Sequence, residues 1–374
     1  SANISWFRAE AHVARAYYYS ELIKRFGGVP IVNTVFNPSV VQDIPQSAYD
    51  DVVKFIVDEI DQHIDSLQEN WKTSDFKSND GRFSRMSALA LKSRVLLYAA
   101  SPLHNPGGDK EKWKLAAAAA KEVMTTPGFH LALYGGGYGQ LFQGSTPITG
   151  TNNEVIFAVR APASNTPETN NYPIGTPGGN SGVVPSQNLV ADYEYTGTPD
   201  PFDPYANRDP RLAATVVTNG SNWNGRVIDQ SPGKTDDMTK ANASKTGFYL
   251  RKFLSENLNL VQGGTAQHNW IIFRYAEILL NYAEAVNEAY GPDVTPPGYP
   301  MTAKAALQMV RDRASTLLPA VTATGTDDFR AVIKHERRIE FAFEDHRYWD
   351  LLRWKDAEQV LKQPLKGVKV SRNP

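Results

Sequence analysis

Cysteine is absent from this chain of 374 residues. Without a thiol the protein can form no disulfide, hold no thiolate-ligated zinc and use no cysteine nucleophile. Net charge is nearly absent too, at −1 at pH 7, and no long run of one sign occurs, so no nucleic-acid partner is expected. No stretch approaches the roughly 20 apolar residues of a membrane-spanning helix, and the first residues carry no secretory signal pattern.

The motifs of several enzyme classes are also missing. The histidines are scattered, and none forms a His-x-x-x-His pair with a nearby acid, so no metal site is expected. The glycine-rich segment at residues 135–139 lacks the Lys-Ser/Thr of a phosphate-binding loop, and no Gly-x-Ser-x-Gly nucleophile turn occurs. We therefore expect no cofactor, no metal and no catalytic residue.

Amphipathic helical patterns occupy both ends of the chain. Apolar residues recur at spacings of three and four in four adjacent pairs of segments: residues 6–26 with 47–70, 84–100 with 109–125, 273–290 with 303–317, and 326–345 with 348–361. Each pair has nearly the length of a tetratricopeptide repeat, although the full repeat signature is absent. The pattern predicts a mainly α fold in which stacked helix pairs form an α–α superhelix around one core.

The composition changes between residues 129 and 270. Asn, Gly, Pro and Thr become frequent there, which is typical of loops. The elements predicted within this segment are few: a strand at residues 153–159, a strand-like stretch at 247–253 and a short capped helix at 185–193. We expect a single domain, in which residues 1–128 and 271–374 form a helical scaffold and residues 129–270 form a loop-rich lobe laid on it.

Charged residues of both signs are concentrated in the last predicted helix pair. Helical spacing places Glu336 and Glu340 among core positions, where an unpaired carboxylate would cost on the order of several kcal/mol. We therefore predict a buried ion lock of Glu336, Arg337, Glu340, Arg347 and Arg353. The alternative is a carboxylate pair for acid–base hydrolysis. We favour the lock, because each acid has an adjacent arginine and no loop presents it to a cleft.

The same region carries a family resemblance. The run E-R-R-I-E-F-A-F-E at residues 336–344, followed by R-Y-W-D-L-L-R-W at 347–354, resembles the C-terminal signature of the SusD/RagB family. Further runs that resemble family motifs occur in family order at residues 14–31, 82–99 and 274–285. Asp345 and Leu352 stand where the family pattern has a glycine and an arginine, which affects local packing.

The resemblance implies a glycan-binding lipoprotein, without catalytic activity, on the outer leaflet of an outer membrane. It implies the same stacked-helix architecture and, as partner, a SusC-like TonB-dependent transporter that this protein covers as a lid. Captured oligosaccharide or polysaccharide would be delivered as the lid closes. Because the chain opens inside a predicted helix, we expect preceding residues, which in the family carry a signal peptide and a lipid anchor on cysteine.

Aromatic and amide side chains of the lobe are the candidate glycan contacts. A sugar ring has apolar C–H faces and hydroxyl edges, so a flat aromatic ring and nearby amides can bind it. The predicted ligand-binding residues, Trp223 foremost, are Trp223, Tyr172, Tyr195, Tyr205, Phe202, Asn222, Asn224 and Asn171. The alternative for any one ring is that it fastens a loop to the scaffold.

Two other functions stay open at this point. A glycoside hydrolase on a helical scaffold would release reducing sugar, and Glu340→Gln would abolish that activity without unfolding the protein. A helical-repeat adaptor that binds only protein would gain no ligand affinity from the aromatic lobe.

Overall fold

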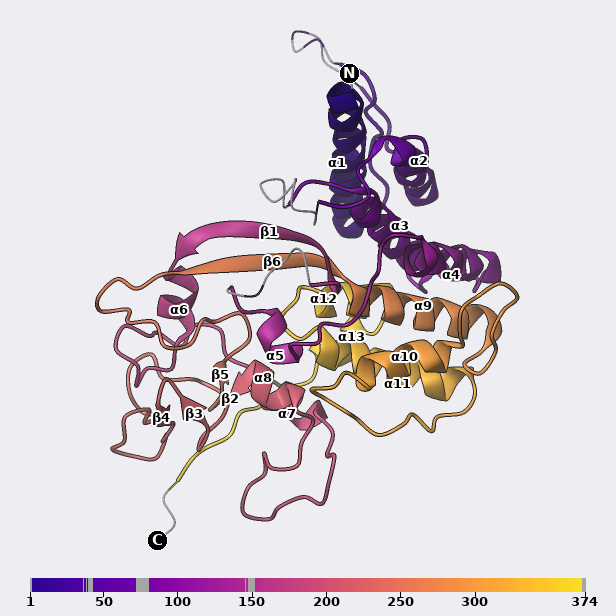
Figure 1. The fold of residues 1–374 in the computed structure, drawn as a ribbon. Coiled ribbons are helices and arrows are strands. Elements are labelled where there is room, and N and C mark those ends of the chain that lie inside the picture. Colours follow the sequence, from indigo (N-terminus) through magenta and orange to yellow (C-terminus); the bar gives the residue numbers. More distant parts are fainter. Residues whose placement is uncertain are drawn as a thin grey trace.

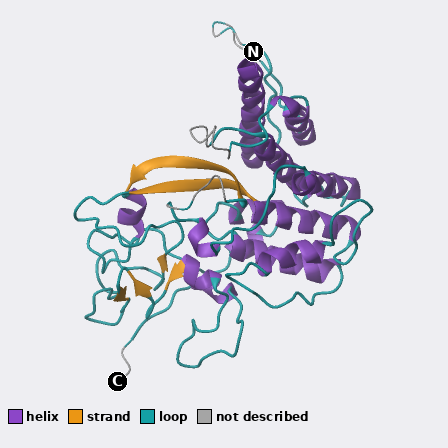
Figure 2. Ribbon diagram, viewed as in Figure 1, coloured by secondary structure: helices purple, strands orange, loops and turns teal. Residues whose placement is uncertain are grey.

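The structure is a computed structural model that describes residues 2–35, 37, 39, 43–71, 81–144, 146 and 152–371. Helices dominate it, and one long pair of strands extends from beside the helices along an edge of the loop-rich part (Figures 1 and 2). The mainly α fold predicted from the sequence is confirmed. In the described residues, no helix has the length and hydrophobicity that crossing a membrane requires.

Four helices form the N-terminal group: α1 (Ala2–Phe26), α2 (Tyr49–Asp61), α3 (Arg85–Ala100) and α4 (Lys110–Thr125). They pair as the sequence predicts, with α1 packed on α2 and α3 packed on α4. Ser84 and Asp109 cap α3 and α4, because their side chains accept backbone N–H groups at the helix starts. α2 is shorter than predicted and continues only as a 3-10 turn at Ile64–Ser66.

Five helices form the C-terminal group: α9 (Tyr275–Tyr290), α10 (Ala303–Arg311), α11 (Thr326–Glu340), α12 (Arg347–Arg353) and α13 (Ala357–Leu361). α9 connects the two groups, because it packs against α4 as well as against α10 and α11 (Figure 1). Nearly all of its side chains are buried, around the whole circumference of the helix. One continuous apolar core therefore runs through both helical groups.

The C-terminal helices are shorter than the sequence pattern predicts. α10 and α11 each end more than a turn early, and the predicted last helix divides into α12 and α13. Backbone φ is positive at Leu317, Phe343 and Lys355, which lie in these connections. A left-handed residue interrupts a helix, and here none of the three is glycine. At Phe343 and Lys355 the sequence therefore carries no glycine stop signal, whereas Pro319 follows Leu317.

The long strand pair consists of β1 (Val155–Ser164) and β6 (Ala266–Arg274), which run antiparallel. β1 contains most of the predicted strand, whereas β6 was not predicted. Two short antiparallel pairs lie among the loops (Figure 1): β2 (Val216–Val217) with β5 (Tyr249–Leu250), and β3 (Asn222–Trp223) with β4 (Arg226–Val227). The remaining helices of this segment are short: α5 (Tyr138–Leu141), α6 (Thr166–Asn171), α7 (Gln187–Asp192) and α8 (Arg211–Thr215). α7 confirms the predicted capped helix, since the Ser186 hydroxyl accepts the N–H of Leu189.

Candidate functional site

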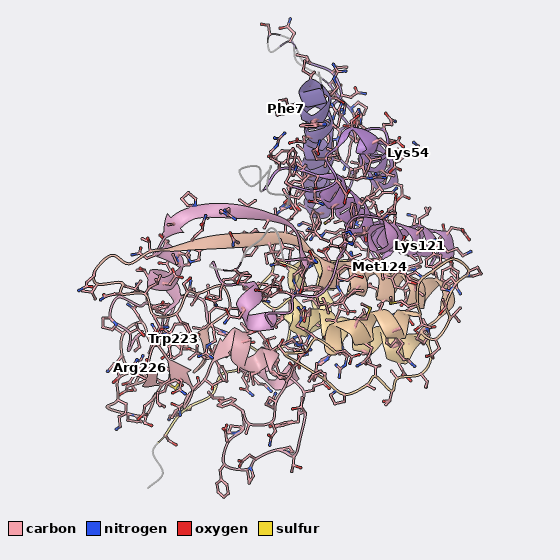
Figure 3. The ribbon with its side chains drawn as sticks, viewed as in Figure 1. Phe7, Lys54, Lys121, Met124, Trp223 and Arg226 are labelled. Atoms are coloured by element: carbon pink, nitrogen blue, oxygen red, sulfur yellow. The ribbon has the colours of Figure 1, made fainter. Side chains whose placement is uncertain are left out.

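Trp223 and Tyr172, two of the predicted glycan contacts, lie inside the molecule. Both side chains are fully buried, and their ring centroids are 5.0 Å apart in an edge-to-face arrangement. They belong to an apolar cluster that also contains Tyr249 and Leu254, and Figure 3 shows Trp223 among the loops of residues 152–270. The structure corrects the expectation that these two rings are open to solvent. A ring with no exposed face cannot stack on a sugar, so here the alternative of a loop-fastening role holds.

Three other predicted aromatics lie on the loop that joins α7 to α8 and projects from the body of the molecule (Figure 1). Phe202 is 95% exposed, so both of its faces meet solvent. Tyr195 is 40% exposed, but the Arg208 guanidinium lies 4.4 Å from its ring centroid. Tyr205 is half-buried and packs edge to face on Phe248. Phe202 is therefore the most openly presented of these three rings.

The predicted amides separate into different roles. The side chain of Asn171 holds its own loop, because it accepts the N–H of Val183 and donates to the carbonyl of Pro167. Asn222 is exposed at the start of β3. Asn224 lines an open hollow of about 520 Å³. We call this the amide-lined hollow, and its full lining is Thr176, Pro177, Asn224, Asn257, Leu258, Asn259, Leu260, Val261 and Gln262.

The buried rings support the floor of the amide-lined hollow. Leu258 and Leu260 pack on the apolar cluster that contains Trp223 and Tyr172. The Tyr172 hydroxyl donates to the carbonyl of Ser255 and lies 3.4 Å from the backbone nitrogen of Leu258. Trp223 and Tyr172 thus position the segment that forms the hollow, although neither reaches its surface.

Two asparagines of the hollow have left-handed backbones and are bonded to each other. Backbone φ is +47° at Asn224 and +68° at Asn257, and the N–H of Asn257 donates to Oδ1 of Asn224 at 2.9 Å. Asparagine tolerates this region better than most residues, yet such residues recur at binding sites. The amide of Asn224 therefore fixes the course of the chain where it enters the hollow.

Hydrogen-bonding capacity remains on the exposed side of the hollow. Oδ1 of Asn259 accepts the N–H of Gln262 at 3.1 Å, which leaves the Nδ2 group of Asn259 for solvent or a ligand. In the part of the chain that the structure describes, the side chains of Asn257 and Gln262 make no intramolecular hydrogen bond. A side-chain amide has both donors and an acceptor, so this wall can donate a hydrogen bond to a sugar hydroxyl or accept one from it.

Residues 257–262 were not singled out from the sequence. A signal for them exists, because Asn257, Leu258, Asn259 and Leu260 alternate amide with leucine. Alternation of this kind predicts leucines that face a core and amides that face solvent. The alternation is short and lies in a loop, so it did not stand out beside the aromatic residues.

The predicted ion lock exists, but its acids pair with other arginines. Glu336 and Glu340 are buried, and both contact Arg211 of α8. Arg274 of β6 lies 2.7 Å from Glu340, and Arg313 lies 2.9 Å from it. Residues next to each other on a helix point about 100° apart, so Arg337 cannot face the partners of Glu336. The lock therefore joins Glu336 of α11 to α8, 125 residues earlier, and Glu340 to β6, 66 residues earlier.

Arg337 and Arg353 belong to a second buried cluster on the other side of α11. Nε of Arg337 lies 2.9 Å from Asp350, and Nη2 of Arg353 lies 2.7 Å from Glu284 of α9. The inclusion of Arg347 in the lock is wrong: it is half-buried and makes no ion pair with the described residues. Four of the five predicted lock residues are thus buried ion-pair members, divided between two clusters.

The electrostatics of Glu340 do not suit acid–base catalysis. Burial raises the pKa of this carboxyl, but the charges of Arg274, Arg313 and Arg211 outweigh burial and hold the pKa well below its usual value. A glycosidase needs one protonated carboxyl and a cleft between the two acids. Glu336 and Glu340 are instead buried and paired. Across the described residues, no group of three or more acidic or histidine side chains is placed to hold a metal ion.

Comparison with known proteins agrees with the helical architecture. The SusD family model matches residues 153–373. A curated relative, SusD-like protein P38 of Formosa agariphila, is 24% identical over 98% of this chain and 69% of its own length. A SusD-like carbohydrate-binding protein of Bacteroides fragilis is 30% identical, with a TM-score of 0.80 over 98% of this chain and 70% of that one. A laminarin-binding SusD-like protein, at 24% identity, has a TM-score of 0.62 over 96% of this chain and 73% of that one. The chain therefore belongs to the SusD family.

Proposed function

We propose that the protein binds an oligosaccharide or polysaccharide at the cell surface, does not cleave it, and delivers it to a SusC-like TonB-dependent transporter. The observation that carries glycan binding on this chain is the amide-lined hollow. Family membership supports the same activity, since one relative is a carbohydrate-binding protein and another binds laminarin. The volume of the hollow, about 520 Å³, falls within the range of about 300–1,000 Å³ that small-molecule sites have.

In this proposal the apolar floor and the amide wall of the hollow contact different parts of the sugar. The C–H face of a sugar lies on Pro177, Leu258 and Leu260, which supply apolar surface in place of an aromatic ring. The amides of Asn257, Asn259 and Gln262 bond to the hydroxyl edge. Asn224, a contact predicted from the sequence, acts mainly by holding Asn257 in place. Phe202 and Tyr195 stay as candidate contacts for a longer chain, because they are exposed.

Calorimetric titration against a glycan panel tests the proposal. We expect binding to at least one glycan, and we expect Asn259→Ala to weaken it by about tenfold, which is about 1.4 kcal/mol. Gln267→Ala is the matched control, because Gln267 is an exposed amide on β6 outside the lining of the hollow. A chain that binds no glycan at all would refute the proposed function.

The absence of catalysis is part of the proposal. It is supported by the burial and ion pairing of Glu336 and Glu340, the acids that a hydrolase would have used. An assay for reducing sugar on each bound glycan separates the two functions. Release of sugar that Glu340→Gln abolishes, with the fold intact, would establish the hydrolase instead.

Outer-membrane location, a lipid anchor on preceding residues and the transporter partner rest on family membership alone. Co-purification of the full-length protein with a TonB-dependent barrel tests the partner, and fractionation of outer membranes tests the location. Recovery of the protein in the soluble fraction, without a barrel, would count against both.

A further inference from the structure

The amide-lined hollow has no ionisable side chain in its lining. Its nine residues comprise three asparagines, one glutamine, one threonine, one proline and three aliphatic residues. From this chemistry we infer that the glycan it takes is uncharged, an unsubstituted neutral oligosaccharide rather than a sulfated or uronate-containing one. The inference rests on the proposed function and names the substrate class of the same site.

Two arginines near the lining, Arg226 and Arg251, are already paired. Arg226 reaches toward Thr176, with 3.4 Å between Nη2 and Oγ1, but its guanidinium is held by both carboxylate oxygens of Asp236, which is itself buried. Figure 3 shows Arg226 beside Trp223, its partner in the β3–β4 pair. Nε of Arg251 lies 3.2 Å from Oε1 of Glu256, which is the residue before Asn257 in the chain. Each of these two positive charges is therefore compensated by a carboxylate of the protein itself.

An anionic sugar would lose more than it gains in this environment. Moving a charged group out of water without a partner is costly, and proteins that bind sulfate or carboxylate supply arginine or lysine for it. A neutral hydroxyl exchanges bonds to water for bonds to an amide at little net cost. The side chains of Asn257, Asn259 and Gln262 can donate to one hydroxyl and accept from another. The wall therefore matches neutral sugar edges and discriminates against charged ones.

Salt dependence gives a second, independent signature. Binding of a charged glycan to a charged site weakens as ions screen the attraction, over a distance of about 10 Å at 0.1 M salt. Binding that depends on amide hydrogen bonds and apolar contact is nearly insensitive to salt. The hollow should therefore hold its ligand equally well at low and high ionic strength.

The experiment is calorimetric titration of oligosaccharides in matched pairs, each pair sharing a backbone but differing in sulfate or uronate content. Measurements are made at about 50 and 500 mM NaCl, between which the screening length falls to about a third. We expect the neutral member to bind at least about tenfold more tightly, a difference of about 1.4 kcal/mol, with a dissociation constant that changes less than about twofold with salt. Gln262→Lys should narrow the preference by at least about threefold, because it adds a cation to the wall. Gln267→Lys is the matched control, because Gln267 lies on β6 outside the lining. It should leave the preference for the neutral glycan unchanged.

The possible results distinguish a failure of the neutral-ligand inference from a failure of the proposed glycan binding. Tighter binding of the charged member, or loss of about tenfold in affinity at high salt, would overturn the inference of a neutral ligand and leave glycan binding intact. Neutral-glycan binding that is unaffected by Asn259→Ala would place the site elsewhere and also overturn the inference. Binding to no member of any pair would refute the proposed function itself.

Discussion

Replacing Glu340 by glutamine removes one negative charge from the middle of the larger buried ion network and changes little else. Glu340 contacts Arg211, Arg274 and Arg313, and all four side chains are buried. Glutamine has nearly the same shape, but its Nε2 group donates, so at least one arginine N–H that Glu340 accepts loses its acceptor along with the charge. The substitution therefore tests the charge of residue 340 with little change in packing.

Among the buried members of this network, carboxylates and cations are equal in number before the substitution, and Glu194, which also pairs with Arg311, is partly exposed. Its buried carboxylates are Glu154, Asp209, Glu336, Glu340 and Glu344, and its buried cations are Arg211, Lys252, Arg274, Arg311 and Arg313. Glu340→Gln leaves one excess positive charge in the interior. Removing one partner of a buried pair typically costs about 3–5 kcal/mol. Each arginine keeps another carboxylate, so we expect a loss near the lower value, about 3 kcal/mol.

Chemical unfolding followed by circular dichroism measures this loss. Glu358→Gln is the matched control, because Glu358 is an exposed carboxylate on α13, and its replacement should change stability by less than about 0.5 kcal/mol. The wild-type protein should also lose stability as the pH falls below about 4.5, the ordinary value for glutamate, because the pKa of Glu340 is lowered in the folded state. The variant should lack part of this acid dependence.

Two results would refute this reasoning. A loss below about 1 kcal/mol, the size expected for an exposed ion pair, would mean that the interior screens these charges far better than their burial indicates. An unchanged acid dependence in the variant would mean that Glu340 titrates normally in the folded protein.

Elsewhere in the protein, substitution of a buried side chain should lower stability, whereas substitution of an exposed one should not. Trp223→Ala should cost about 3–5 kcal/mol in chemical unfolding, whereas Phe202→Ala, at a fully exposed ring, should stay within about 0.5 kcal/mol; equal losses would contradict the burial of Trp223. Arg353→Ala should cost about 3–5 kcal/mol, because it removes the close ion-pair partner of Glu284 and one of the two arginines that hold Asp350, whereas Arg347→Ala should cost less than about 1 kcal/mol; the reverse order would restore Arg347 to the lock. Burial lowers the pKa of Lys252 from 10.5 to about 8, so the folded state binds fewer protons than the unfolded state between these values, and stability from this group should rise with pH across that window. Lys252→Met should lack that rise in a pH series of unfolding curves, and an identical rise in both proteins would show that Lys252 titrates normally.

The helices could be predicted because their apolar periodicity is local information. The acids of the ion lock could be predicted for the same reason, since Glu336 and Glu340 fall on the apolar stripe of α11. Their partners could not, because Arg211 and Arg274 are brought to them only by the folding of segments far away in sequence. Strand β6 was missed because its pairing partner, β1, lies about a hundred residues earlier.

The candidate site was harder to predict, because exposure is a property of the folded chain. Trp223 lies among polar and glycine residues, which indicates an exposed loop, yet the loops form an apolar cluster of their own around it. Asn224 is the one predicted contact that lines the amide-lined hollow. Loops need buried anchors, and large aromatic residues supply the most apolar area for that purpose. Aromatic residues in a loop-rich segment are therefore ambiguous until their burial is known.

The larger ion network affects how cooperatively the protein unfolds. Arg211, Lys252 and Arg274 belong to the loop-rich segment or its boundary, whereas Glu336, Glu340 and Glu344 belong to α11 and the turn after it. If the loop-rich segment detached alone, the ion pairs between these two sets of charges would be lost together, although Arg311 would stay with Glu336 and Arg313 with Glu340. Such a half-open species is costly, so melting should be cooperative, with a single calorimetric transition for both parts of the chain.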